Sequence, residues 1–454
     1  MLAPECEYQA GDYSSSYVQH GQGLGPSVIC GIVNRASYTL LTYLLLPLIF
    51  VRLWWRSLKD ARYRQRWSER MAYYPRNAFD TSKAGIVFHT VSVGELHAAV
   101  PLIRACQENL PDWTFTITTT TVTGSARLKD IFGESVQHCY IPYDLPGAVQ
   151  RFLQAVKPQA LIIMETELWP NLLHYCVLDN IKLLLLNARL SEKSFLRYQK
   201  YPRMSREMLE SFNVVAAQFE QDANNFRRLG LPASALHISG TMKFDQQINQ
   251  QQSEAGLALK QSLRRPVLVA GSTRAGEEEK VLQAFRQIIK QLPEALLILV
   301  PRHPERIAAV SGLLTNKGFS FVKRSSGASI TGDKQILLGD SMGEMQFYYA
   351  CADIAFVGGS LVDTGCQNII EPAVLGVPVI TGPSLFNFQA VSEILLNRGA
   401  MIVVTNEVGL AQTSLELFAN AAQHQTMSDA ARATVAEYAG ATERQKQLIL
   451  RAIH

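Results

Sequence analysis

The 454-residue sequence lacks the short motifs that mark the commonest nucleotide and metal sites. It contains no GxxxxGK[ST], which excludes a P-loop, and no predicted strand is followed by GxGxxG, which argues against a dinucleotide cofactor. Neither HExxH nor an Asp-x-Asp pair occurs, so a metal-dependent scheme is disfavoured. The seven cysteines are scattered and include no CxxC pair, which indicates a reducing compartment rather than a disulfide framework or a zinc site.

Charge is also sparse. Charged residues make up 18% of the chain, and the formal net charge of +4 is too small to argue for a nucleic-acid partner. Apolar residues account for 47%, which is a globular composition and excludes a disordered, collagen-like or coiled-coil chain. The length suits about three ordinary domains or two large ones.

The sixteen residues 36–51 (ASYTLLTYLLLPLIFV) form a strongly apolar run without a charge. Seven basic residues follow by position 70, against two acidic ones. A full span needs about 20 apolar residues, so we expect a membrane anchor over 36–56 that either spans or is half-inserted, with the basic flank holding the chain on the cytoplasmic side. A buried core helix is the alternative. Residues 1–35 have no periodicity and are predicted to be a disordered extension; the sequence leaves open whether they belong to the functional protein.

The rest of the chain alternates β-branched runs with amphipathic helical patterns, which is typical of parallel α/β sheets. The predicted strands are 86–93, 114–121, 160–164, 183–187, 214–217, 236–239, 266–270, 296–300, 335–338, 354–357 and 377–381. A Gln-rich stretch from 245 to 261 interrupts the pattern. We therefore predict two doubly wound, Rossmann-like domains, 57–247 and 265–428, joined by a linker over 248–264 and followed by a C-terminal helix, 429–454, that packs back on the first domain.

In such sheets ligands bind beyond the carboxyl ends of the strands, which makes the residues after each strand the candidates for chemistry. Glu95 follows the first strand and stands three residues after Ser92, so it is either a capping-box residue or a general base. Glu165 and Glu167 follow a buried strand, where carboxylates cost stability and therefore suggest function. Lys243 follows the last strand of the first domain and is either a cleft residue or a solvated loop lysine.

Four strand ends of the second domain carry small or polar groups. They are the segments 271–273, 301–304, 341–344 and 358–371. Glycines and helix N-termini offer backbone N–H groups to a phosphate, and a carboxylate in the first helical turn can hold ribose hydroxyls. Each segment alone is equally compatible with an ordinary cap or turn, but together they predict a nucleotide-phosphate site.

In combination these segments resemble the 3-deoxy-D-manno-octulosonic acid (Kdo) transferases of lipopolysaccharide assembly. Besides the anchor and its basic flank, the motifs that carry the resemblance are HTVSVGE (89–95), IPYDLPGAV (141–149), METELWPN (164–171), NARLSEKS (187–194), SGTMKFD (239–245), AGSTRAGEEE (270–279), LVPRHPER (299–306), GDSMGEM (339–345), FVGGSLV (356–362) and NIIEPAVLG (368–376). Such enzymes often have Gly-Gly-His-Asn where this chain has Gly365-Cys366-Gln367-Asn368, so an imidazole is missing beside the phosphate.

The resemblance implies a GT-B fold, in which two Rossmann-like domains face a cleft. It implies an inverting, metal-independent transfer of Kdo from CMP-Kdo to a lipid A precursor (lipid IVA), without a cofactor, at the cytoplasmic side of the inner membrane. Glu95 is then the proton acceptor, and Glu165 and Lys243 stabilise the transition state. The residues implied to bind CMP are Pro301, Arg302, Met342, Gly343, Glu344, Asn368, Ile369, Ile370 and Glu371. A membrane-associated GT-B enzyme using a UDP- or GDP-sugar remains the alternative.

Overall fold

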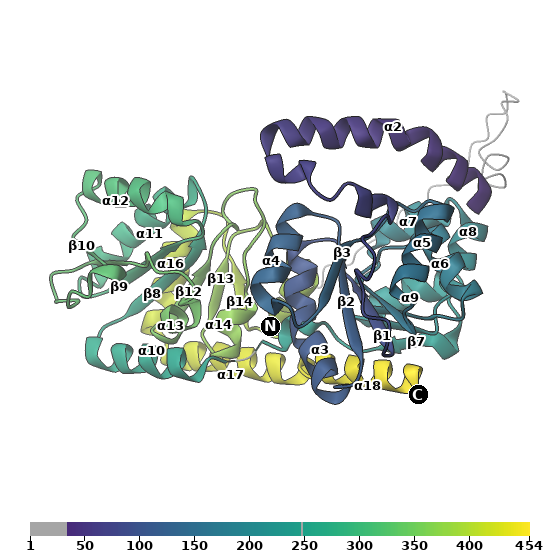
Figure 1. Ribbon diagram of the computed structural model, residues 1–454. Coiled ribbons are helices and arrows are strands. Elements are labelled where there is room, and N and C mark those ends of the chain that lie inside the picture. Colours follow the sequence, from purple (N-terminus) through teal and green to yellow (C-terminus); the bar gives the residue numbers. More distant parts are fainter. Residues whose placement is uncertain (1–33, 247) are drawn as a thin grey trace, which may run out of the picture.

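The structure, a computed structural model, describes residues 34–246 and 248–454. These residues form two α/β domains that lie side by side, with one long helix across the first of them (Figure 1). The N-terminal extension predicted for residues 1–35 falls, as far as residue 33, outside the described residues.

The first domain is built on a parallel seven-stranded sheet in the order β3-β2-β1-β4-β5-β6-β7. Its strands are β1 (Gly85–His89), β2 (Thr114–Thr119), β3 (Gln137–Tyr140), β4 (Ala160–Met164), β5 (Lys182–Ala188), β6 (Val214–Ala217) and β7 (Leu236–Ile238). Its helices are α3 (Val93–Asn109), α4 (Val122–Phe132), α5 (Pro146–Val156), α6 (Pro170–Leu178), α7 (Glu192–Gln199), α8 (Pro202–Glu210) and α9 (Glu220–Arg228). Helices cover both faces of the sheet, which is why a central strand such as β4 is an unbroken apolar run buried at every position.

The second domain repeats the plan with a parallel sheet in the order β10-β11-β9-β8-β12-β13-β14. Its strands are β8 (Val267–Thr273), β9 (Leu296–Pro301), β10 (Phe321–Lys323), β11 (Ile336–Leu338), β12 (Ile354–Val357), β13 (Val379–Thr381) and β14 (Met401–Val403). Its helices are α10 (Gln250–Leu263), α11 (Glu277–Gln291), α12 (Ile307–Asn316), α13 (Met345–Ala350), α14 (Ile370–Val374), α15 (Gln389–Asn397), α16 (Glu407–Ala419) and α17 (Ala421–Tyr438). The α/β prediction with two doubly wound sheets is therefore confirmed.

Both sheets reverse their strand order at one place. In the first sheet the chain builds outward from β1 through β2 to β3 and then restarts on the other side with β4. In the second sheet the reversal lies between β8 and β12. Loops diverge at such a point and leave a crevice beyond the strand ends, so the topology itself marks two places for a ligand.

The sequence analysis did not predict three of the strands. They are β3 and the two edge strands β10 and β14, each only three or four residues long. Short edge strands contain too few positions to show a period, and β3 carries Gln137 and His138. The segment predicted as a linker also differs from expectation, because most of it forms α10, a helix that packs against α13 of the second domain.

The C-terminal segment contains a break. The chain runs along the second domain as α17, turns at Gly440 (φ 85°), and continues as α18 (Ala441–Ile453), which contacts α3 and β5 of the first domain. Figure 1 shows these two helices passing beneath both domains. The carboxylate of Asp245 accepts the N–H groups of Gly440 and Ala441 at the start of α18, and Gln445 accepts the N–H of Asn187 at 3.1 Å. These contacts connect the two domains at the end remote from α2.

Helix α2 (Arg35–Lys59) lies across the outside of the first domain (Figure 1). Arg35 and Thr39 both donate hydrogen bonds to the Asn171 side chain, at 3.2 and 3.0 Å. Farther along, Phe50 meets the rings of Trp67 and Tyr143. The helix is therefore fastened to the domain by one of its faces.

Candidate active site between the two domains

The predicted catalytic residues of the first domain converge on one cavity. Glu95, Glu165 and Lys243 all line a space of about 1030 Å³, whose opposite wall includes Asn368 and Glu371 of the second domain. Glu95 and Glu165 follow β1 and β4, the two strands between which the sheet order reverses. The topological crevice and the carboxylates chosen from sequence thus coincide.

Glu95 is held at the start of α3 by local hydrogen bonds. Ser92 is the N-cap and accepts the N–H of Glu95 at 3.2 Å, and its own hydroxyl donates to Oε1 of Glu95 at 2.9 Å. Oε2 accepts the N–H of Val91 at 2.7 Å. The capping interpretation is therefore correct in its main features, and it serves to orient the carboxylate beside the cavity.

Burial raises the pKa of Glu95 from its ordinary 4.5 to about 7, even though the hydrogen bond from Val91 favours the charged form. The negative charges of Glu165 and Glu167 are smaller contributions to the same rise. A carboxyl group that titrates near neutrality is a far better proton acceptor than an ordinary glutamate. The same position can thus be a helix cap and a general base.

This pKa predicts the pH dependence of any reaction in which Glu95 accepts a proton. Since the base must be ionised, kcat/KM should rise about tenfold per pH unit below about pH 7 and level off above it. Stability should move in the opposite direction: the folded pKa lies above the unfolded one, so this group's contribution is lost as the pH rises from about 4.5 to about 7. Steady-state kinetics beside thermal melts over this range measure both, and a flat kinetic profile between about pH 6 and pH 8 would contradict the assignment.

Glu165 sits on a bend in the backbone directly after β4. Its φ of 58° is in the left-handed region that disfavours residues with a side chain, and its N–H donates to the carbonyl of Leu186 at 2.9 Å, which continues the ladder between β4 and β5. Two residues on, Glu167 accepts the indole N–H of Trp169 at 3.1 Å, and burial raises the pKa of this second carboxyl group. A strained backbone at a strand end is typical of functional sites, which supports the sequence-based choice of this cluster.

Lys243 reaches the cavity from the short 3₁₀ turn Met242–Phe244 that follows β7. Its ammonium group lies 4.8 Å from the centre of the Phe388 ring of the second domain, a cation–π contact between the two domains. Burial lowers the pKa of Lys243, and the charge of Glu165 opposes this effect. The lysine is therefore a cleft residue and not a solvated loop residue.

The second domain supplies an adjoining cavity of about 400 Å³. Five of the residues predicted to bind the nucleotide line it: Pro301, Arg302, Met342, Gly343 and Glu371. Glu371 also lines the Glu95 cavity. The cavity lies at the carboxyl ends of β8 and β9, next to the point between β8 and β12 where that sheet reverses its order. A ligand bound here would extend past Glu371 toward Glu95.

The structure limits how three of the residues predicted to bind the nucleotide could contact it. The side chains of Ile369 and Ile370 are fully buried in the hydrophobic core, so only their backbone is available to a ligand. Glu344 pairs with Arg324 at 3.2 Å and accepts the hydroxyl of Ser341, and it does not line the cavity. Motif position could not reveal this, because the burial of an isoleucine and the pairing of a glutamate depend on tertiary neighbours.

Gln246 is a residue of this site that sequence reasoning missed. Its amide donates to Glu371 at 3.2 Å and accepts from the amide of Asn368 at 2.9 Å. Burial raises the pKa of Glu371, and the hydrogen bond from Gln246 opposes that shift. Gln246 thus ties the end of the first domain to the nucleotide side of the cleft, and its place directly after the SGTMKFD motif was the only available signal.

Gln367 stands where the family that the sequence resembles often has histidine. Its side-chain oxygen accepts a hydrogen bond from Nε of Arg302 at 3.2 Å. The side chain that replaces the imidazole therefore orients one of the predicted nucleotide-binding residues. Among the described residues no group of three or more His, Cys, Asp or Glu side chains is placed to hold a metal ion.

Comparison with known proteins identifies relatives of this chain. Residues 65–246 match the family model described as 3-Deoxy-D-manno-octulosonic-acid transferase (kdotransferase). The 3-deoxy-D-manno-octulosonic acid transferase of Haemophilus influenzae is 39% identical over 418 residues, 91% of this chain and 98% of that protein. The transferase of the same name from Bordetella pertussis is 35% identical over 423 residues, 91% of this chain and 98% of its own.

The fold has distant solved relatives. A crystal structure of Anabaena Alr3699/HepE in complex with UDP covers 81% of this chain and 99% of its own, at 12% identity and a TM-score of 0.53, which shows a shared fold alone. The identity to the Haemophilus and Bordetella proteins extends over nearly their whole length and includes both domains. The chain belongs to the 3-deoxy-D-manno-octulosonic acid transferase family.

Proposed function

We propose that this protein transfers Kdo from CMP-Kdo to a lipid A precursor, lipid IVA, with inversion at the sugar and without a metal ion. The observation that carries the proposal is Glu95, a carboxylate with a pKa of about 7 beside a cavity that both domains line. Membership of the Kdo transferase family supports the sugar. The adjoining cavity around Arg302 and Glu371 supports a nucleotide-activated donor.

In the proposed reaction Glu95 accepts the proton of the attacking sugar hydroxyl. The new bond forms between that oxygen and the anomeric carbon of Kdo while the bond from this carbon to the CMP phosphate oxygen breaks. CMP leaves as an anion, so positive charge from Arg302 and Lys243 would stabilise it. Glu165, whose charge interacts with Lys243 in the same cavity, would stabilise positive charge that develops on the sugar in the transition state. Closure of the two domains would exclude water and suppress hydrolysis of the donor.

We also propose that α2 attaches the enzyme to the cytoplasmic face of the inner membrane. The stretch Arg35–Leu58 is long and apolar enough to cross a bilayer by its length and composition. Its contacts with Asn171 and Tyr143, however, keep it on the surface of the first domain. Large apolar side chains along its other face are exposed: Leu40, Leu41, Leu44, Leu48, Val51, Trp54, Trp55 and Leu58. This arrangement favours the half-inserted alternative, with the helix lying in the plane of the interface.

A membrane-fraction assay tests the proposal. Full-length enzyme, CMP-Kdo and lipid IVA should yield a product whose mass exceeds that of the acceptor by one or more Kdo residues. The matched reaction omits the donor and should leave the acceptor unchanged. If the wild-type enzyme does not transfer Kdo under these conditions, the assignment of either the donor or the acceptor is wrong. Replacing lipid IVA with other acceptors shows which of the two assignments is wrong.

A UDP- or GDP-sugar is the alternative donor, and nucleotide binding separates it from CMP-Kdo. We expect CMP to bind with at least about tenfold higher affinity than UDP, because a cavity built to hydrogen-bond one base leaves polar groups unpaired with another. Titration calorimetry with CMP, UDP and GDP measures the difference. Tighter binding of UDP or GDP would favour the alternative.

A further inference from the structure

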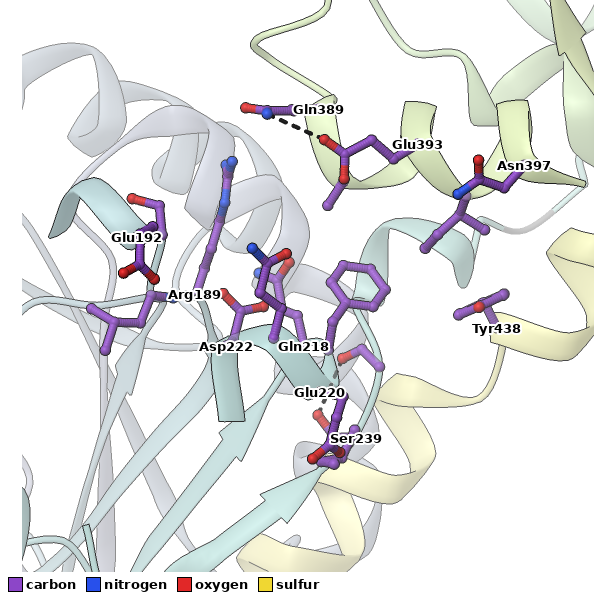
Figure 2. Close-up of a pocket in the computed structure, with 18 of the residues that line it drawn as sticks. Arg189, Glu192, Gln218, Glu220, Asp222, Ser239, Gln389, Glu393, Asn397 and Tyr438 are labelled. Atoms are coloured by element: carbon purple, nitrogen blue, oxygen red, sulfur yellow. Dashed lines mark hydrogen bonds between the residues drawn. The ribbon is translucent and has the colours of Figure 1, made fainter. Parts of the chain in front are cut away.

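The cleft between the domains contains a second compartment whose lining residues have no role in the reaction described above. It has a volume of about 920 Å³ and lies beyond the carboxyl ends of β5, β6 and β7, facing α15 of the second domain (Figure 2). Lys243 and Phe388 line the catalytic cavity, whereas Gly240 and Gln389 line this compartment. The contact between Lys243 and Phe388 therefore stands at the border between the two spaces.

Most carboxylates around the compartment already have partners. Three are held in ion pairs with arginines, with N–O distances of 3.1, 2.6 and 2.6 Å: Glu192–Arg228, Glu220–Arg227 and Glu437–Arg398. Asp222, which is buried, accepts the N–H of Leu190 at 2.7 Å. Because these carboxylates already have partners within the protein, few remain to bind a cationic ligand.

Arg189 is different. Its backbone is fixed directly after β5, because its N–H donates to the hydroxyl of Thr166 at 3.3 Å. Its half-buried side chain extends into the compartment (Figure 2), and within the described part of the chain the guanidinium has neither a hydrogen bond nor an ion pair. Its charge acts through space on Asp222 and Lys243. A guanidinium has five N–H donors in a planar fork that matches a carboxylate, and here they are unused.

The remaining lining suits a sugar ring. Gln218, Gln389 and Asn397 place amide groups around the compartment. The amide nitrogens of Gln218 and Gln389 each donate one hydrogen bond within the protein, to the Asn187 carbonyl at 2.8 Å and to Glu393 at 3.2 Å. Within the described residues, their amide oxygens and the Asn397 amide are left to hydrogen-bond hydroxyls. Phe219 and Tyr438, whose ring centres are 6.3 Å apart, supply apolar surface for the faces of the ring. Apolar walls with a few directed polar groups are typical of small-molecule sites.

We propose that this compartment binds a carboxylated sugar, with the sugar carboxylate paired to the Arg189 guanidinium and the hydroxyls held by the amides. The inference rests on the proposed function, because Kdo is the carboxylated sugar of that reaction. Its source is either the Kdo of the donor or a Kdo already attached to the acceptor. A phosphate fits less well, because its second negative charge would lie near Asp222 and Glu393.

The test compares wild type with Arg189→Gln, and uses Arg203→Gln as the matched control. Arg203 lies on α8, outside the compartment, and pairs with Glu207 on the surface, so its substitution makes the same change of charge. Free Kdo is titrated by ligand-observed NMR and CMP by calorimetry. Arg189→Gln should weaken binding of free Kdo at least about tenfold and leave CMP binding unchanged, whereas Arg203→Gln should change neither. Arg189→Lys, which keeps the charge and loses the fork, should give an intermediate loss.

Two further titrations identify the source of the sugar. If the compartment holds the donor's sugar, Arg189→Gln weakens CMP-Kdo but not CMP. If it holds a sugar on the acceptor, the variant weakens the Kdo-bearing acceptor and leaves CMP-Kdo unchanged. Equal binding of free Kdo by wild type and Arg189→Gln, or an equal loss of CMP affinity in that variant, would overturn the proposal. A wild-type enzyme that still transfers Kdo in that case would leave the proposed function intact.

Discussion

Glu95→Gln is expected to keep the fold and CMP binding and to lose transfer, with kcat reduced by about 10² to 10⁴-fold. Glutamine has nearly the same shape as glutamate. Its amide oxygen can accept the N–H of Val91 and its amide N–H can donate to the Ser92 hydroxyl oxygen, so the start of α3 should persist. It cannot take a proton at neutral pH. The loss should appear in kcat and not in the affinity for CMP, because Glu95 lies on the first-domain side of the cleft.

Glu134→Gln is the matched control, because Glu134 is an exposed carboxylate just after α4 and does not line the cavity. It should retain wild-type kcat. Steady-state assays together with CMP calorimetry and a thermal melt separate the outcomes. Near-normal turnover by Glu95→Gln would refute the base assignment, and a joint loss of melting temperature and CMP affinity would show that the residue is structural.

The second large effect concerns the outer face of α2. Replacing Leu44, Leu48 and Trp55 with glutamine should release the enzyme from membranes. These side chains are 67%, 64% and 57% exposed, so the substitutions remove apolar surface. The hydrogen bonds of Arg35 and Thr39 and the ring contacts of Phe50, which hold α2 on the first domain, are left in place. Each large apolar side chain that is buried contributes about 1.5–3 kcal/mol, so three of them account for at least about 10³-fold in partitioning.

Co-sedimentation with vesicles that contain anionic lipid measures this partitioning. The control variant changes three exposed apolar residues elsewhere, Leu196, Leu257 and Val408, to glutamine and should sediment like wild type. Kdo transfer to a detergent-solubilised acceptor should survive in the α2 variant, since the catalytic cavity is untouched. A variant that stays with the vesicles would show that α2 does not carry the attachment.

Several features of this protein can be predicted from local patterns in its sequence alone. Alternating apolar runs determine the two parallel sheets, because a strand covered on both faces has to be apolar throughout. The spacing from Ser92 to Glu95 specifies the cap of α3, and the acidic pair after β4 stands out because carboxylates rarely follow a buried strand without a reason. The uncharged run likewise predicts a long apolar helix, which the structure has as α2.

Other features depend on what the fold brings together. No spacing rule places Gln246 between Asn368 and Glu371, because these side chains come from opposite sides of the cleft. The raised pKa of Glu95 requires burial by its neighbours and the charge of nearby acidic residues, and the sequence by itself predicted only a helix terminus, which would lower it. Likewise, Arg189 is an ordinary arginine in the sequence. Only the tertiary structure pairs its neighbours with other partners and leaves its guanidinium facing the cleft, since ion pairing is decided by distances in space and not along the chain.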